Sequence, residues 1–351
     1  MGKIDIGTKE FLKISDVFAE LFNVAVFQGT DYINPDDLEE LDSVNGKAVE
    51  LADGQLKFKE KFRDVKKLAK MGICFRIILG IEEQTEVHYY MPVRCMAYDA
   101  DAYEHQCNEI RTRNIAQGKD FNPVSGVPKG TKIFPVLTLV FYVGADEWDG
   151  PRELYDMFDI PEDKEELVRR YIPNYPIYIF DAKHLSDEEI EQFRGDLRAF
   201  LCMICEEYDV AKLEGILANF QETWYAISAI KNDDRYYEEY CNYLKEEPEK
   251  VAADGGVRVD AVLDRIERRG VEIGEKRGMA IGEKRGMAIG EKRGMAIGEK
   301  RGVEIGENNG FVISAQVFKA VQAGMTDNNA IAKKCSCTVA QVQSVRKAFD
   351  I

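Results

Sequence analysis

The 351-residue chain contains no apolar run close to the roughly 18 residues that a membrane-spanning helix needs. Its first five residues also lack the apolar core of a secretory signal peptide. We therefore expect a soluble, cytoplasmic protein without a membrane partner. The remaining composition, 45% hydrophobic and 31% charged, is typical of a globular protein.

Histidine is scarce, with three residues in the whole chain, whereas cysteine occurs eight times. Without a secretion signal, these cysteines are expected to be reduced thiols. The pairs Cys202/Cys205 and Cys335/Cys337 have spacings that zinc sites use, but zinc needs about four Cys or His ligands. Cys202 lies in the apolar run 200–204 and Cys205 directly follows it, so core packing is the favoured interpretation for both.

Charge is divided unevenly along the chain. Residues 257–351 contain 17 Lys+Arg and 12 Asp+Glu, a net charge of +5, so residues 1–256 carry −21 of the total −16. An acidic surface opposes nucleic-acid binding, because phosphate contacts supply much of the affinity. A nucleic-acid enzyme of this composition would need a local basic patch or bound metal ions.

Hydrophobic periodicity predicts an α/β fold, a mixed β-sheet flanked by helices. Near-continuous apolar runs favour buried strands, and apolar residues three and four apart favour helices. The strands are expected over 73–81, 133–143 and 175–180, and the helices over 8–23, 88–113 and from an N-cap at Ser186. Residues 56–70 form a charged segment without a clear period. Strands that alternate with helices are typical of this fold class.

An octapeptide, Gly274-Glu-Lys-Arg-Gly-Met-Ala-Ile281, recurs from Gly282 and Gly290 and, in a variant form, from Gly298. Eight residues rotate a helix by about 80°, so no face stays apolar. Each glycine costs about 1 kcal/mol relative to alanine in a helix. We expect a Gly-rich repeat linker over residues 251–308, either a marginal helix or a tether. An oligomerising coil is the alternative.

Residues 309–351 predict a small helical unit that resembles a helix-turn-helix. Thr338 and Gln341 fit a capping box for its last helix. The side chains expected inward are Val317, Phe318, Val321, Val339, Val342, Val345 and Phe349. The polar groups that would contact base edges or phosphates are Gln341, Gln343, Ser344, Arg346 and Lys347. A helical bundle that docks on protein is the alternative.

The residues that suggest chemistry surround the first buried strand. Asp64 precedes that strand, and Glu82 and Gln84 stand two apart near its end, so these two point to the same face. Two converging carboxylates suit Mg²⁺, which would polarise a phosphate and lower the pKa of a bound water. Gln84 would orient the water or the phosphate. The alternative is that these acids are simply solvated at strand ends.

The string from Gly80 to Arg94 resembles the core signature of the Rpn family of recombination-promoting nucleases. These proteins are also called putative transposases and belong to the PD-(D/E)XK nuclease superfamily. The likeness covers residues 5–230 and includes Tyr98-Asp99-Ala100, Tyr103, Gln106, 135–140 and 148–151. It implies a restriction-endonuclease-like core over residues 1–250 and a Mg²⁺-dependent DNA endonuclease that promotes recombination or transposition.

The same resemblance implies roles for individual residues. Asp64 and Glu82 match the acidic metal ligands of the family, and Gln84 stands where the superfamily usually has lysine. A further acid of the first helix corresponds to Asp16 or Glu20, and we favour Glu20. Glu83 departs from the family pattern, which often has Asn or His there, and adds negative charge near the metal.

Three neighbouring side chains leave alternatives open. Arg94 and Tyr98, at i and i+4, could reach a phosphate, although a salt-bridged arginine is equally expected. His88 could face the site or stand at the start of the helix.

For the whole chain, DNA is the expected partner. The rival interpretations are a catalytically inactive DNA- or partner-binding protein with a nuclease-like fold, and a homo-oligomeric scaffold assembled through the repeats.

Overall fold

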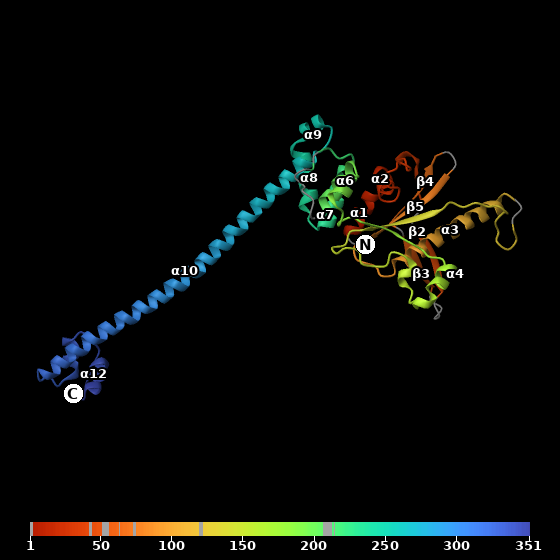
Figure 1. The fold of residues 1–351 in the computed structure, drawn as a ribbon. Helices are drawn as coiled ribbons and strands as arrows, with labels where there is room; N and C mark the ends of the chain where they lie inside the picture. The colour runs from red at the N-terminus through yellow and green to blue at the C-terminus, as the bar shows by residue number, and fades with distance from the viewer. Residues whose placement is uncertain are drawn as a thin grey trace. The chain divides into compact units, whose positions relative to one another are not determined.

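The computed structural model describes residues 3–41, 44–50, 56–62, 64–72, 75–118, 122–205, 213 and 215–351 (Figure 1). Two residues of the strand expected over 73–81, Ile73 and Cys74, lie outside this part. The chain forms two compact units, Met1–Arg268 and Arg269–Ile351. Within the described residues, no helix has the length and apolar character needed to cross a membrane.

The described residues of the first unit form the strands β1 Leu38–Glu40, β2 Val44–Glu50, β3 Leu56–Phe62, β4 Val65–Met71, β5 Phe75–Gln84, β6 Val136–Tyr142 and β7 Tyr178–Asp181. Its α-helices are α1 Lys3–Leu12, α2 Ser15–Ala25, α3 Met91–Ala116, α4 Glu165–Tyr171, α5 Asp187–Ile190, α6 Gly195–Ile204, α7 Phe220–Lys231, α8 Arg235–Glu246 and α9 Pro248–Asp254. Short 3₁₀ turns occur at η1 Pro35–Asp37, η2 Leu154–Met157 and η3 Glu162–Lys164.

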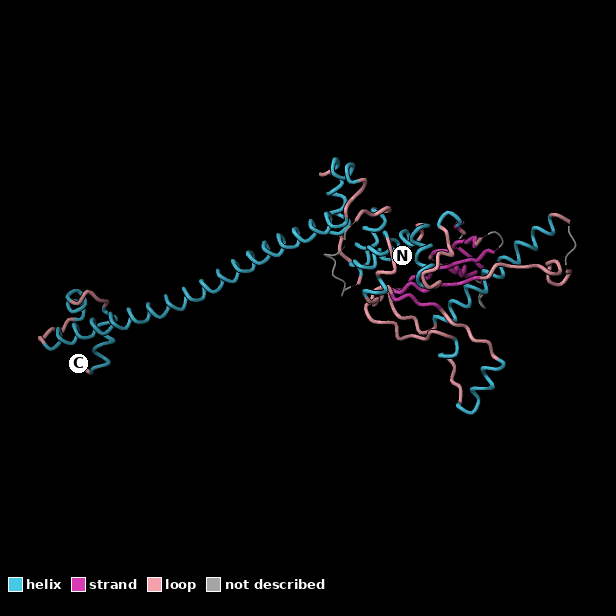
Figure 2. The backbone as a smooth tube through the Cα atoms, turned by 45° about the horizontal axis from the view of Figure 1, so that its top comes forward, coloured by secondary structure: helices cyan, strands magenta, loops and turns pink. Residues whose placement is uncertain are grey.

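Figure 2 shows the strands in magenta. Five of the described strands form one mixed sheet in the order β1-β4-β5-β6-β7. β1, β4 and β5 pair antiparallel, whereas β5, β6 and β7 pair parallel. β2 and β3 form a separate antiparallel pair. The predicted mixed sheet flanked by helices is thus confirmed, and β5, β6 and β7 all end at the same sheet edge.

The two faces of the sheet carry different layers. Leu79 and Ile81 of β5 belong to the large core that also contains residues of α1, α2, α6 and α7. Val140 and Tyr142 of β6 pack instead against the start of α3. Strand side chains alternate between faces, and paired residues of neighbouring strands share one. Because Glu82 pairs with Val140 and Gln84 with Tyr142, these two polar residues lie on the α3 face.

The helix predicted over 8–23 is two helices, α1 and α2. Ile14 between them has the extended angles φ −60° and ψ 128°, which break the helix. Phe11, Leu12, Val17 and Phe18 are nevertheless all buried in one core. The spacing of the apolar residues survives the break, which is why the sequence indicated a single helix.

The cysteine interpretation is confirmed for the described residues. Cys202 and Cys205 are buried in the core, with exposed fractions of 0% and 4%. All seven described cysteines are free thiols. The CxxC spacing here reflects one buried helix face and the residue that caps it.

The repeats lie in α10, Val259–Gln322, a continuous helix whose repeat residues are exposed. A methyl group added at Gly278, Gly286 or Gly294 would meet nothing within 4 Å. Glu272, just before the first repeat, and Lys276 form an i,i+4 ion pair at 2.5 Å. Within the identical repeats 274–297 themselves, the acidic and basic residues are adjacent and do not have this spacing. Of the two expectations, helix or tether, the structure has the helix.

The C-terminal residues contain the helices α11 Asn328–Lys334 and α12 Val339–Phe349. Thr338 and Gln341 form the expected capping box. The prediction that Phe349 points inward is wrong, because its side chain is 56% exposed. It is the last residue of α12 and makes only an edge contact with the Phe318 ring, at 5.8 Å between centroids.

Candidate functional site

The β4–β5 pairing brings Asp64 to Glu82 across a separation of eighteen residues. Val65 pairs with Ile81 in the antiparallel ladder, so Asp64, one residue earlier, lies opposite the next residue of β5. Asp64 Oδ2 accepts a hydrogen bond from the backbone N–H of Glu83 at 2.8 Å. The carboxylate of Asp64 is therefore held at the end of β5.

Gln84 lies on the same face of β5 as Glu82, two residues further along. Its Nε2 donates to Glu82 Oε1 at 3.4 Å and to the Glu83 carbonyl at 2.6 Å. The amide nitrogen is thus engaged within the strand end. The structure brings together Asp64, Glu82 and Gln84, the three residues that the sequence grouped.

The carboxylate of Glu82 is also contacted from α3. Arg94 Nη2 forms an ion pair with Glu82 Oε1, and Tyr98 OH lies 3.5 Å from the same oxygen. Arg94 Nε donates to Tyr98 OH at 3.0 Å. Glu82 is 1% exposed and Arg94 32%. For Arg94, the structure therefore has the salt-bridged arrangement that the sequence left open.

The charges of Glu82 and Asp64 both affect the pKa values of Arg94 and Tyr98. Burial would lower the pKa of Arg94, but Glu82, the Tyr98 hydroxyl and Asp64 outweigh it and raise that pKa. Burial, together with the charges of Glu82 and Asp64, raises the pKa of Tyr98, and Arg94 opposes this. Asp64 and Glu82 thus act on one common polar cluster.

This donor set fits a hard divalent cation. Two carboxylates and a side-chain amide are oxygen donors of the kind that Mg²⁺ accepts, and Mg²⁺ usually keeps several waters. Among the described residues, no group of three or more His, Cys, Asp or Glu could hold a metal ion. Any cation bound here would therefore rest on the two acids Asp64 and Glu82, with Gln84 or water completing its shell.

Glu20 is not brought into this cluster. It belongs to α2, which packs on the sheet face opposite α3. Its Oε1 accepts from the backbone N–H of Arg194, where α6 begins, and it lines a cleft of about 630 Å³ together with Asp16. Burial raises the pKa of Glu20 to about 7. These contacts describe a carboxylate that caps a helix.

We expect Glu20→Gln to stabilise the fold more at pH 8 than at pH 5. An acid whose folded pKa, about 7, exceeds its ordinary value of 4.5 is protonated in both states below pH 4.5. As pH rises through 7, the folded protein must hold a buried charge and loses stability. Glutamine keeps the acceptor for Arg194 without that charge. Thermal unfolding at both pH values measures the difference, and an equal shift at both would contradict this account.

His88 stands before α3, where its backbone carbonyl accepts from the N–H of Met91 at 2.9 Å. Burial and the nearby Arg94 charge lower the pKa of its imidazole, which favours the neutral form. The residue thus stands at the helix start, one of the two places that the sequence allowed.

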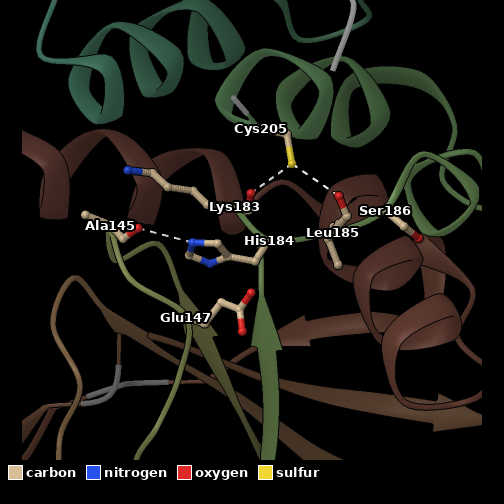
Figure 3. A pocket seen from close by; sticks show the side chains of 7 residues that line it. All are labelled: Ala145, Glu147, Lys183, His184, Leu185, Ser186 and Cys205. Carbon is tan, nitrogen blue, oxygen red and sulfur yellow. Dashed lines mark hydrogen bonds between the residues drawn. The ribbon is translucent and has the colours of Figure 1, made fainter. Parts of the chain in front are cut away.

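A second cavity, of about 350 Å³, follows the ends of β6 and β7 (Figure 3). His184 bonds Asp181 Oδ1 through Nδ1 at 2.7 Å and the Ala145 carbonyl through Nε2 at 3.2 Å. Burial disfavours its charged form, but Asp181, the Ala145 carbonyl and Glu147 outweigh that and raise the pKa of the ring. His184 thereby ties the loop after β6 to the loop after β7. The sequence analysis did not single it out: its contact with the Ala145 backbone has no signal in the sequence, whereas the i,i+3 spacing of Asp181 and His184 does.

Residues 57–230 match the family described as "Putative transposase, YhgA-like". The match includes β4, β5, α3, β6 and β7, and so all of Asp64, Glu82, Gln84 and Arg94. No curated protein and no solved structure matches the chain. The resemblance identified from the string at Gly80–Arg94 is confirmed. Over residues 57–230, the chain is thus similar to the family of putative transposases described as YhgA-like.

Proposed function

We propose that this protein is a divalent-metal-dependent DNA endonuclease that hydrolyses phosphodiester bonds in support of transposition or recombination. The observation that carries the proposal is the meeting of Asp64, Glu82 and Gln84 at the end of β5, inside the segment that matches the transposase family. Transposition requires breakage of DNA strands, and this cluster offers hard oxygen ligands suited to that chemistry.

Each residue has a distinct role in the proposed reaction. Asp64 and Glu82 would hold a divalent cation through their carboxylates. Such a cation would supply polarisation of the scissile phosphate and a bound water of lowered pKa. Gln84, fixed to Glu82 and to the Glu83 carbonyl, orients water or a phosphate oxygen.

Gln84 stands where the superfamily usually has lysine and carries no charge, so Arg94 supplies the positive charge. Its guanidinium neutralises the buried Glu82 carboxylate, and its partly exposed position leaves it within reach of a docked phosphate. The planar fork of arginine matches a phosphate in two-point geometry. The charge of Arg94 is already part of the net −21 on residues 1–256, so its contribution is local to this site.

A second candidate is a DNA-binding protein with this fold but without cleavage. The observation that favours it is the same acidity, which opposes productive contact with the backbone of DNA. Binding without cleavage would identify this function.

Asp64→Ala tests the proposal directly. Supercoiled plasmid is incubated with the full chain and Mg²⁺, with EDTA as the metal-free arm, and nicked and linear products are measured over time. We expect wild type to cut only with Mg²⁺ and Asp64→Ala to lose that activity. Asp163→Ala is the matched control, because Asp163 is 71% exposed and pairs with the exposed Lys164. Equal cleavage by wild type and Asp64→Ala would remove Asp64 from the mechanism.

A further inference from the structure

The C-terminal helices pack around a small core of their own. The buried residues of this cluster come from the end of α10, from α11 and from α12: Val317, Ala320, Ile331, Ala332, Cys335, Val342 and Val345. This core lies in the second compact unit, Arg269–Ile351, and outside the residues that match the family. The function of the family therefore does not account for it.

The connection between α11 and α12 is short and fixed by backbone geometry. Ser336 has a positive φ of 49°, which turns the chain sharply. The N–H of Cys337 donates to the Ala332 carbonyl at 3.1 Å, and Thr338 then caps α12. Two helices joined by a short turn are the connection that the helix-turn-helix motif uses.

Arg346 locks the second helix onto the first. Its Nη1 donates to the Thr326 carbonyl at 3.1 Å and to Asn328 Oδ1 at 2.8 Å. Arg346, which the sequence offered as a contact to DNA, is thus used to hold α12 against the start of α11. Gln341 closes the capping box with Thr338, so Gln343, Ser344 and Lys347 are the polar residues of α12 considered for another role.

The outward face of α12 is polar and lacks negative charge. Gln343, Ser344 and Lys347 are exposed, and helical rotation of about 100° per residue places them on one side, opposite Val342 and Val345. Residues 328–349 contain four bases, Lys333, Lys334, Arg346 and Lys347, and no Asp or Glu. This contrasts with the −21 of residues 1–256.

We propose that α11, the turn and α12 form a duplex-DNA-binding site, with α12 as the helix that enters the major groove. Gln343 and Ser344 offer donors and acceptors to base edges, and glutamine pairs well with adenine. Lys347, Lys333 and Lys334 meet phosphates. A second copy of this chain fits the surface less well, because apolar side chains are few on this face and stable interfaces have apolar centres.

The test measures duplex binding by the full chain in EDTA, so that cleavage cannot interfere. A fluorescent duplex is titrated at several salt concentrations. We expect the double variant Gln343→Glu/Lys347→Glu to bind about tenfold more weakly, with a salt slope smaller by about 1. Lys319→Glu is the control for the charge reversal at Lys347, because Lys319 is exposed on the side of α10 away from Val317 and Ala320. Its affinity should stay close to wild type.

Ser344→Arg is a second variant with an expected effect of opposite sign. It adds a cation to the groove face and should tighten duplex binding several-fold at low salt. Misfolding cannot produce such a gain in affinity. Equal duplex affinity in wild type and the double variant would overturn the proposal. So would a change in oligomeric state by light scattering at unchanged duplex affinity, which would identify the face as a protein interface. Neither outcome bears on the acids of β5, whose role is measured by Mg²⁺-dependent cleavage.

Discussion

Glu82→Gln should lower the rate of Mg²⁺-dependent DNA cleavage on the order of a hundredfold or more, the effect typical of removing one preorganised electrostatic group. Glutamine has nearly the same shape and keeps an oxygen for Tyr98 and Arg94, so the fold around α3 should persist. It lacks the negative charge that holds a divalent cation. The loss should therefore appear in the cleavage rate, with only a small change in thermal stability.

Glu83→Gln is the matched control for that measurement. Glu83 is the adjacent acid in the same strand, 8% exposed, and its side chain points to the opposite face because strand side chains alternate. Its backbone N–H, which holds Asp64, is unchanged by the substitution. We expect Glu83→Gln to cleave at close to the wild-type rate. Comparable losses in both variants would show that net charge at this strand end matters and that the identity of the acid does not.

The placement of Glu82 with Gln84 could be predicted because it depends on local rules. An apolar run predicts β5, and the two-residue period places Glu82 and Gln84 on one face. The position of Asp64 beside them depends on the antiparallel pairing of β4 with β5. The partner of Glu82 could not be fixed in the same way. Arg94 lies in the next helix, and whether it reaches a carboxylate or solvent depends on how α3 packs on the sheet.

β4 was missed for a specific physical reason. Its sequence reads as charged, yet Lys66 and Lys67 are buried, with exposed fractions of 8% and 2%. Lys67 Nζ reaches Ser15 Oγ at 3.3 Å and Glu40 at 3.6 Å, so its aliphatic stem fills the core while its charge finds partners. A pattern that counts lysine as exposed cannot detect such a strand.

Glu20 shows why the position of a residue chosen from a family resemblance cannot be predicted from the sequence alone. The sequence identified an acid on the first helices but could not place α2 relative to the sheet. In the structure, its carboxylate meets the N–H of Arg194, 174 residues later in the chain. Such a contact depends on the packing of α2 against α6, and no spacing within either helix encodes it.

Removal of Arg94 should destabilise the protein through Glu82. Arg94→Met leaves a carboxylate that is 1% exposed without its guanidinium partner. Breaking a fully buried pair costs about 3–5 kcal/mol. Because Arg94 is 32% exposed and solvent screens the pair, we expect a loss of about 2 kcal/mol. This corresponds to a fall of about 4–8 °C in Tm for a unit of this size.

The double variant Glu82→Gln/Arg94→Met separates charge from packing. If the penalty comes from the buried charge, neutralising Glu82 should restore most of the lost Tm, because the two substitutions act on one interaction. If the Tm losses of the two single variants instead add up in the double variant, the effect comes from the packing of the arginine stem against Tyr98.

Mg²⁺ should then stabilise Arg94→Met more than wild type. A cation that binds Asp64 and Glu82 can replace the missing guanidinium, and a ligand that binds only the folded state raises Tm. In wild type, Arg94 already neutralises Glu82, so the gain in Tm on adding Mg²⁺ is smaller. Thermal unfolding with Mg²⁺ and with EDTA measures this without any DNA. An identical response to Mg²⁺ in both proteins would show that the cation does not share a site with Arg94, whatever the cleavage assay finds.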